Sequence, residues 1–294
     1  MSVAISERWL IPVTAGQAVS HGWTAATAGR PAGVTWHWTA THDLVTCSRV
    51  LGGANPTRRG IASAHYGIGR TRSEGVDRYV ALDDRSWHAG INQLLRWDGA
   101  LVRSAHDKGS RTTIGVETVG IGYARPGVGA GPDWIRVATP DGRTELSVQP
   151  WTDEQIELMV HVGKEIIARW PHIRPSDHHG HSDLCPTYKQ DVLGFPFAPV
   201  LRGIYDDPGI ADVWTPVRTP TQRQRVLLAL GYDLGAAGAD GDWGNKSDSA
   251  LTRFHVDVGL PAQPLWTSFT CLHAHARLSA SGFGLADVAG ASDP

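Results

Sequence analysis

The stretch GVTWHWTA, from Gly33 to Ala40, is the clearest strand signal in this chain of 294 residues. Apolar and polar side chains alternate along it, with Val34, Trp36 and Trp38 on one side and Thr35, His37 and Thr39 on the other. A period of two residues is that of a β-strand. The pattern therefore predicts a strand that carries His37 on its polar face.

Strands and helices are predicted to alternate beyond this stretch. Further strands cover SAHYGIGR (63–70) and DRYVALDD (77–84), which the turn residues SEG (73–75) join as a hairpin. TIGVETVG (113–120) predicts a strand with Gly115 and Glu117 on one face. The best helix runs from Thr152 to Trp170, with Thr152 and Gln155 as a capping box. Strands with interspersed helices predict an α/β or α+β domain.

The composition is that of an ordinary soluble globular protein, with 41% hydrophobic and 19% charged residues. A net charge of −2 without any Lys/Arg block gives no reason to expect nucleic acid as a partner. The first residues lack the pattern of a signal peptide, and no stretch approaches the length of a membrane span. Cys47, Cys185 and Cys271 are odd in number and scattered, which predicts no disulfide framework and folding in a reducing cytosol.

The segment HHGHSDLCPTYKQD, from His178 to Asp191, gathers several chemically active side chains. His181, Lys189 and Asp191 fall within eleven residues of one another. His181 and Asp191 are potential metal ligands, and His37 supplies a third from far upstream. Two imidazoles and one carboxylate leave one tetrahedral position open for water, which is typical of a catalytic zinc site. Lys189 places a positive charge between the two ligands in sequence.

Past Phe197 the character of the sequence changes. Residues 206–218 are rich in Pro and Asp and have no sustained period, which predicts a linker. A helical unit is predicted over 219–280, where the stretches QRQRVLLALGYDLG (222–235) and SDSALTRFHVDVGL (247–260) flank the turn ADGDWGN (239–245). Residues 1–205 are expected to form the larger domain, and 281–294 a flexible tail.

Six short motifs occur in an order that one enzyme family shows. They are VTWHWTA (34–40), SAHYGIGR (63–70), DDRSWHAG (83–90), TIGVETVG (113–120), the helix start WTDEQ (151–155) and GHSDLCPTYKQD (180–191). From about Gly33 to Gly194 the chain resembles the zinc-dependent N-acetylmuramoyl-L-alanine amidases. That group includes phage lysozyme-like amidases, muropeptide-recycling amidases and peptidoglycan recognition proteins. The resemblance implies an α/β fold with a mixed central β-sheet flanked by helices.

The resemblance also implies a role for each site residue. It assigns the zinc ligands, the catalytic carboxylate and the lysine before the last ligand to His37, His181, Asp191, Glu117 and Lys189. Zinc lowers the pKa of its water to about 7 and polarises the scissile carbonyl. Glu117 can take the proton of that water and return it to the leaving amine. Lys189 can stabilise the oxyanion of the tetrahedral intermediate.

The third ligand has alternatives within the same segment. The branch of the family that uses aspartate places it ten residues after the GHSD histidine, and this predicts Asp191. Cys185 lies four residues after His181, and a thiolate is a good zinc ligand. His178 and His179 also lie within reach. The sequence QDVLG replaces the usual DPG ending, so the loop around Asp191 departs from the family pattern.

Two substrate contacts are expected outside the catalytic group. The WHAG loop lies near the cleft in the family, so His88 is predicted to touch substrate, whereas His65 is expected to pack or to orient a neighbour. The helical unit resembles the small three-helix peptidoglycan-binding domain, chiefly through LGY (230–232) and DGDWG (240–244). Trp243 is accordingly predicted to contact substrate. The long segment 120–150 resembles an insertion.

These expectations combine into one prediction of function. The chain is expected to be a monomeric zinc hydrolase that cuts the amide between the lactyl group of N-acetylmuramic acid and L-alanine in peptidoglycan. The wall-binding unit and the lack of a signal peptide predict a phage endolysin, made in the cytoplasm and acting on the bacterial cell wall after release. The alternatives are a cytosolic amidase that recycles anhydro-muropeptides and a non-catalytic peptidoglycan recognition protein.

Overall fold

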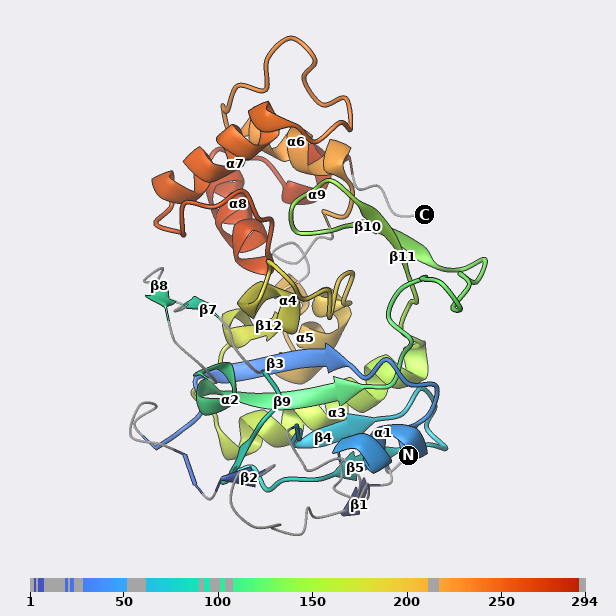
Figure 1. Cartoon of the computed structure of the whole chain (residues 1–294). Coiled ribbons are helices and arrows are strands. Elements are labelled where there is room, and N and C mark those ends of the chain that lie inside the picture. The colour runs from blue at the N-terminus through green and yellow to red at the C-terminus, as the bar shows by residue number, and fades with distance from the viewer. Residues whose placement is uncertain are drawn as a thin grey trace.

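A six-stranded, mostly parallel β-sheet forms the centre of the larger part of the molecule (Figure 1). This computed structural model describes residues 3, 5–7, 19–20, 22–23, 29–51, 62–89, 93–95, 101–103, 108–210 and 217–290. The strands lie in the order β1 (Ile5–Glu7), β5 (Val76–Arg78), β4 (Tyr66–Ile68), β9 (Thr113–Thr118), β3 (Gly33–Trp38) and β12 (His178–Gly180). Neighbouring strands in it are parallel except for β4 and β5. The predicted α/β fold with a mixed central sheet is confirmed.

Helices cover both faces of the sheet. On one face, α3 (Asp153–Arg169) and α5 (Phe197–Tyr205) bury their apolar sides against Trp36 and Val116. On the other face, α1 (Leu44–Leu51) packs against Tyr79, whose ring lies over Gly67 of β4. Burial of these apolar surfaces is the main force that holds the layers together.

The predicted alternation in β3 is confirmed, but the polar face of this strand is buried rather than exposed to solvent. Thr35 and His37 are 0% and 1% exposed, because His179 of β12 and the loop that carries His88 contact their side chains. The predicted hairpin is also present, since β4 and β5 pair in antiparallel register. Its second strand ends at Arg78 rather than reaching residue 84, because Tyr79 turns into the cluster beneath α1.

The long helix α3 begins and ends close to the predicted residues. Thr152 is its N-cap and accepts a hydrogen bond from the Gln155 backbone amide. The expected capping box is incomplete, because the Gln155 side chain donates instead to the carbonyl of Val119. Gln155 thereby ties the start of α3 to the end of β9, which carries Glu117.

Shorter elements complete this part of the chain. A 3-10 turn (Pro175–Asp177) leads into β12, and α4 (His181–Leu184) follows it directly. Segment 120–150 contains the hairpin of β10 (Ile135–Ala138) and β11 (Glu145–Val148). The other short elements are the pair β2 (Val19–Ser20) and β6 (Arg85–Ser86), the pair β7 (Gln93–Leu95) and β8 (Leu101–Arg103), and α2 (Lys108–Thr112).

The C-terminal helices form a unit with its own apolar core. Its helices are α6 (Pro220–Ala229), α7 (Asn245–Asp257), α8 (Ser268–Ala280) and α9 (Leu285–Ala289). The helix α9 lies in the stretch predicted to be a flexible tail, and that prediction is wrong for it. Leu285 and Ala289 are fully buried, because they close the core beneath α6. Residues 291–294 lie outside the described part of the chain.

The helical unit lies beside α4 and the β10–β11 hairpin (Figure 1), and buried contacts join it to the sheet domain. Arg223 of α6, 3% exposed, donates to the carbonyls of Ala138 and Thr139 at 2.8 and 2.6 Å. The backbone amide and the hydroxyl of Ser268 both donate to Asp183 of α4 at 2.8 Å. Within the expected linker, Ile210 and Val217 are each 6% exposed, whereas residues 206–209 are exposed. Among the described helices, none is both long and apolar enough to cross a membrane.

Candidate metal centre

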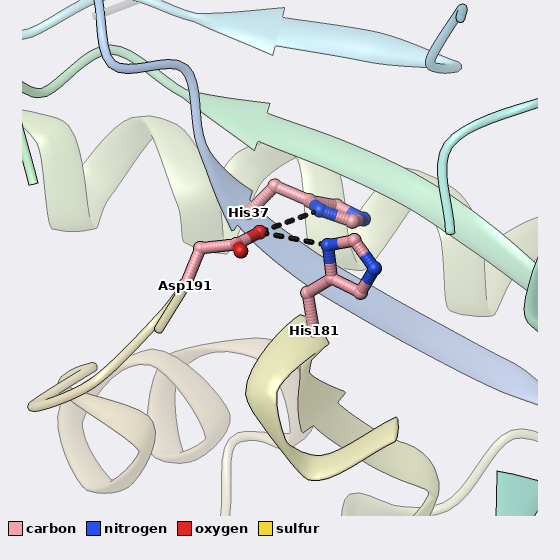
Figure 2. Close-up of side chains that lie close together, drawn as sticks. All are labelled: His37, His181 and Asp191. Carbon is pink, nitrogen blue, oxygen red and sulfur yellow. Dashed lines mark hydrogen bonds and ion pairs between the residues drawn. The ribbon is translucent and has the colours of Figure 1, made fainter. Parts of the chain in front are cut away.

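Three side chains from distant parts of the chain meet near the end of β3 (Figure 2). His37 comes from β3, His181 is the first residue of α4, and Asp191 lies on the loop after α4. Asp191 Oδ2 is 3.0 Å from His37 Nδ1 and 2.9 Å from His181 Nδ1. The potential ligand atoms all lie within 4.8 Å of one another. The structure therefore brings together the three residues that the sequence suggested as zinc ligands.

The alternative ligands lie outside this group. Cys185 is buried at the C-terminal end of α4 and does not belong to the His37, His181 and Asp191 group. Both ring nitrogens of His178 have partners, because Nδ1 accepts from the Trp36 indole and Nε2 meets the Tyr205 hydroxyl. His179 Nε2 lies 2.8 Å from the hydroxyl of Thr35. The side chains of His178 and His179 thus serve the packing of β12 against its neighbours.

Hydrogen bonds behind the two ligand histidines leave Nδ1 of each ring available to a metal. His181 Nε2 lies 3.1 Å from the Ala89 carbonyl, which can only accept, so this nitrogen carries the proton. His88 Nε2 likewise donates to the Thr113 carbonyl at 3.0 Å. Burial holds the pKa of His88 well below its usual value, so its Nδ1 is an acceptor. His37 Nε2 can then donate to His88 Nδ1, 3.0 Å away, and a metal ion could take the place of the hydrogen bond between His37 Nδ1 and Asp191.

His88 contacts His37 in this structure, and its predicted contact with substrate stays a prediction. Its side chain is buried, and its ring occupies the space beside Gly115 of β9. A Cβ atom at position 115 would lie 2.3 Å from His88 Cγ, so a larger residue there would displace the ring. The sequence indicated space for a side chain here, since Gly115, which has no side chain of its own, shares a strand face with Glu117.

Replacing His88 is expected to weaken zinc binding. His88→Phe keeps a ring in the cavity but removes the acceptor for His37 Nε2–H, so His37 is no longer held in the ligand tautomer. We expect the zinc dissociation constant to rise about 10–100-fold, the range typical of lost outer-shell partners. Competition with a chromophoric chelator measures it. His88→Asn places an oxygen near the former Nδ1 and should recover part of the affinity. Equal affinities for His88→Phe and the unmutated protein would contradict this role.

The electrostatics of the group suit a divalent cation. Burial opposes the charge of Asp191, but the neighbouring His181 outweighs burial and holds the pKa of Asp191 well below its usual range. Burial also opposes the charge of His181, yet Asp191 raises the pKa of His181 to about 10. Burial and the charge of His181 lower the pKa of His37 to about 4. Two imidazole nitrogens and a carboxylate oxygen fit zinc, which would replace the proton on His181.

Glu117 lies beside the group, on the strand next to His37. The parallel register of β3 and β9 pairs His37 with Glu117, so both side chains point to the same face. The carboxyl group is 8% exposed. Burial, together with the nearby charge of Asp191, raises the pKa of Glu117 to about 8, although His181 and Lys189 oppose the shift. A carboxyl group with its pKa near neutrality is suited to exchange protons with water or an amine.

The raised pKa of Glu117 predicts a pH-dependent stability effect. The metal-free fold binds a proton at Glu117 more tightly than the unfolded chain does. Protonated Glu117 therefore adds to the free energy of unfolding. This stabilisation is fully present below pH 4.5 and is lost as the pH rises to about 8. Glu117→Gln should therefore raise the melting temperature of metal-free protein, by on the order of 5 °C at pH 8 and much less at pH 5. Thermal melts in a chelator measure it, and a gain independent of pH would refute the assignment.

Lys189 and Trp243 lie in different settings. Lys189 is half-buried on the loop before Asp191, and its charge acts on both His37 and Glu117. Its Nζ lies 5.8 Å from the ring centre of Tyr188, which is 54% exposed. Trp243 is only 5% exposed and packs in the core of the helical unit, so it has little surface to offer a sugar ring. We therefore assign Trp243 to packing.

The family comparison covers the part of the chain that carries this group. The chain matches the family model described as N-acetylmuramoyl-L-alanine amidase over residues 27–192. No curated protein matches it. One similar solved structure is AmiD from E. coli, in complex with anhydro-N-acetylmuramic acid-L-Ala-D-γ-Glu-L-Lys. The two sequences are 21% identical, the match covers 87% of this chain and 92% of the AmiD chain, and the TM-score is 0.46.

Two further solved structures are similar to this chain. AmpDh3 from Pseudomonas aeruginosa is 20% identical, with 93% of this chain and all of its own covered and a TM-score of 0.45. PlyL is 14% identical, with 68% and 96% covered and a TM-score of 0.42. The family match itself spans more than half of the chain and includes all three potential ligands and Glu117. The chain belongs to the N-acetylmuramoyl-L-alanine amidase family.

Proposed function

We propose that this protein is a zinc-dependent amidase that hydrolyses the bond between N-acetylmuramic acid and L-alanine in peptidoglycan. The observation that carries the proposal is the convergence of His37 Nδ1, His181 Nδ1 and Asp191 Oδ2 near the buried carboxyl group of Glu117. Membership of the amidase family supports the same bond. A bound zinc ion would supply the Lewis acid that activates water and polarises the scissile carbonyl.

The chain's own residues supply the remaining chemistry. The carboxylate form of Glu117 can accept a proton from the attacking water. Burial raises the pKa of Glu117 to about 8 in the metal-free protein, and a cation bound beside it would favour the carboxylate form. Glu117 can then return the proton to the amine of L-alanine as the amide bond breaks. Lys189 supplies positive charge for the oxygen of the tetrahedral intermediate. The burial of His37 and His181 excludes bulk water behind the ligands, which strengthens these interactions.

We further propose that the natural substrate is the wall polymer and that the protein is an endolysin. The support is the helical unit, whose sequence resembles a peptidoglycan-binding domain and whose helices pack directly against the sheet domain. A polymer held by a second unit stays at high effective concentration near the catalytic group. An amidase that recycles soluble anhydro-muropeptides would gain nothing from such a unit.

Digestion of purified sacculi tests the proposed reaction. The expected products, identified by mass spectrometry, are intact stem peptides with a free L-alanine amino terminus, together with glycan chains that keep their length. Addition of a chelator should stop the digestion, and added zinc should restore it. Products with new reducing sugar ends, or peptides cut between later residues, would refute the amidase assignment. Digestion of soluble anhydro-muropeptides alone would favour the recycling enzyme.

Removal of the helical unit is expected to affect sacculi more than small substrates. Truncation after Asp206 keeps every proposed ligand as well as Glu117 and Lys189. The shortened protein should keep its zinc and cleave soluble muropeptides at a similar rate, but it should digest sacculi more slowly because tethering is lost. Zinc content and a thermal melt verify that the truncated protein is folded. Unchanged digestion of sacculi would argue against a wall-binding role.

A further inference from the structure

A row of four residues crosses the face of the central sheet that carries Glu117. Asp77 of β5 pairs with Gly67 of β4. Gly67 pairs in turn with Glu117 of β9, and Glu117 pairs with His37 of β3. Residues paired in this way direct their side chains to the same face of a sheet. The Glu117 side chain therefore lies between His37 on one side and the position of a glycine on the other.

The Tyr79 hydroxyl group fills the space that Gly67 leaves open. Tyr79 directly follows β5, and a Cβ atom at position 67 would overlap its hydroxyl oxygen. Because neighbouring strands lie about 4.8 Å apart, this oxygen is the next group along the row from the Glu117 side chain. The Cys47 thiol lies 3.4 Å from the same oxygen, and burial followed by the charge of Glu117 raises the pKa of that thiol. Both observations place the Tyr79 hydroxyl beside Glu117.

The hydrogen bonds around the Tyr79 hydroxyl fix the direction in which it donates. The hydroxyl of Ser48 in α1 contacts Asp77 Oδ2 and lies 2.8 Å from the Leu44 carbonyl. A carboxylate oxygen and a carbonyl oxygen only accept, so the single proton of the Ser48 hydroxyl is used there. Ser48 Oγ is also 2.9 Å from the hydroxyl oxygen of Tyr79. Tyr79 is therefore the donor in this pair, and its proton points toward Ser48.

With its proton committed to Ser48, Tyr79 has no donor to offer Glu117. Within the described part of the chain, the Tyr79 hydroxyl bonds to Ser48 and Cys47 rather than to Glu117. The lone pairs of its oxygen repel a carboxylate that turns toward it. Ser48 and Tyr79 are buried, so bulk water supplies no competing donor on this side. The charges that favour a Glu117 carboxylate come instead from His181 and Lys189.

We propose that Ser48 and Asp77 are positioning residues, which hold the Tyr79 proton away from Glu117 and so keep the Glu117 carboxylate turned toward His37 and His181. The inference rests on the proposed function for the role of Glu117 in hydrolysis. Its distinguishing consequence is that a freed Tyr79 hydroxyl does the harm, rather than the loss of a buried contact. Removal of that hydroxyl should then undo the damage that removal of Ser48 causes.

Hydrolysis of a soluble muropeptide by the full-length zinc protein tests this consequence. Ser48→Ala lets the Tyr79 hydroxyl donate to Glu117, which draws the carboxylate away from the attacking water. We expect kcat to fall about tenfold or more, with KM and zinc content unchanged. Tyr79→Phe keeps the ring over Gly67 and should lower kcat by about threefold or less. The double variant Ser48→Ala/Tyr79→Phe should recover to the level of Tyr79→Phe, which a loss through misfolding would not do.

A matched control and a direct structural measurement complete the test. Ser249 also donates to the carbonyl four residues before it in a helix, but it lies in α7 of the helical unit, so Ser249→Ala should leave kcat unchanged. Crystal structures of the metal-free unmutated and Ser48→Ala proteins give a measurement that does not depend on activity. The Glu117 carboxyl group should lie within hydrogen-bonding distance of the Tyr79 hydroxyl only in the variant.

Three results would overturn the positioning role. They are an unchanged kcat in Ser48→Ala, losses that simply add in the double variant, and a Glu117 carboxyl group that keeps its place in the Ser48→Ala structure. The proposed function fails in a different way. If the unmutated zinc protein does not hydrolyse the muropeptide, the amidase assignment is refuted, while a Glu117 side chain that turns toward Tyr79 in Ser48→Ala still supports the positioning role. Hydrolysis without recovery in the double variant refutes the positioning role alone.

Discussion

His181→Ala is expected to abolish both zinc binding and amide hydrolysis. His181 provides one of three potential ligand atoms, and its removal also leaves Asp191 without the partner that most favours its charge. Two protein ligands do not complete the site that catalytic zinc uses. Metal analysis of the purified protein should give one zinc per chain for the unmutated protein and none for the variant. Hydrolysis of soluble muropeptides should fall to background, and added zinc should not rescue it.

The identity of the third ligand is tested with the same measurements. Asp191→Ala should lose zinc, whereas Cys185→Ser should retain it because Cys185 lies outside the group of potential ligand atoms. Cys185→Ser is also a suitable control for packing, since the cysteine is the buried C-cap of the short helix that begins at His181. The opposite result, with zinc lost only from the cysteine variant, would assign the thiolate as the ligand. Full hydrolysis by chelated protein would reject a metal mechanism.

Glu117→Gln is expected to lower kcat by about 100-fold or more while zinc remains bound. The amide keeps the shape of the carboxyl group but cannot accept a proton from water. Because the same change removes a buried ionisable carboxyl group, the variant should be more stable in metal-free form at pH 8 even though it is less active. A gain in stability with a loss of turnover separates a catalytic role from a structural one. A kcat near that of the unmutated protein would remove Glu117 from the mechanism.

Lys189→Ala tests whether Lys189 stabilises the oxyanion of the tetrahedral intermediate. The change should also lower kcat about 100-fold, with zinc content unchanged, because Lys189 is not among the potential ligands. The two variants should differ in their dependence on pH, since only Glu117→Gln removes the group whose pKa lies near 8. The kcat of Lys189→Ala should thus still vary across that range. A Lys189→Ala profile that is only displaced to higher pH, with full kcat recovered there, would argue that Lys189 acts only by lowering the pKa of Glu117.

Local sequence patterns were sufficient for the parts of the fold that depend on neighbouring residues. A period of two located β3 and β9, and it placed His37 and Glu117 on the polar faces that the parallel register later aligned. Helical spacing and the Thr152 cap located α3. These patterns succeed because alternation and capping act over a few residues of chain. The extent of β5 was not predictable in the same way, because Tyr79 leaves the sheet to join a cluster with α1.

Burial was harder to foresee than the identity of the elements. The sequence placed Thr35 and His37 on a polar face of β3, and in the structure His179 and the loop that carries His88 cover both side chains. A polar residue on a covered face must find a partner, and Thr35, His37 and His88 all do so in other segments. Sequence alone does not say which distant segment supplies the partner. The resemblance predicted that His88 touches substrate, but it did not show that the His88 ring contacts His37.

The sequence by itself determined the class of fold, the strand faces that carry His37 and Glu117, and a set of residues able to bind a metal, because each depends on residue type and short-range periodicity. The proximity of His37 to Glu117 depends instead on the pairing of β3 with β9, which are far apart in the chain. Tertiary structure decided which atoms converge. It set His181, Asp191 and His37 within one group, placed Cys185 outside it, and oriented His37 through His88. It also joined the insertion to the helical unit and brought the Tyr79 hydroxyl beside Glu117. These features arise from packing between segments far apart in the chain, where burial and complementary hydrogen bonds, rather than local pattern, select the contacts.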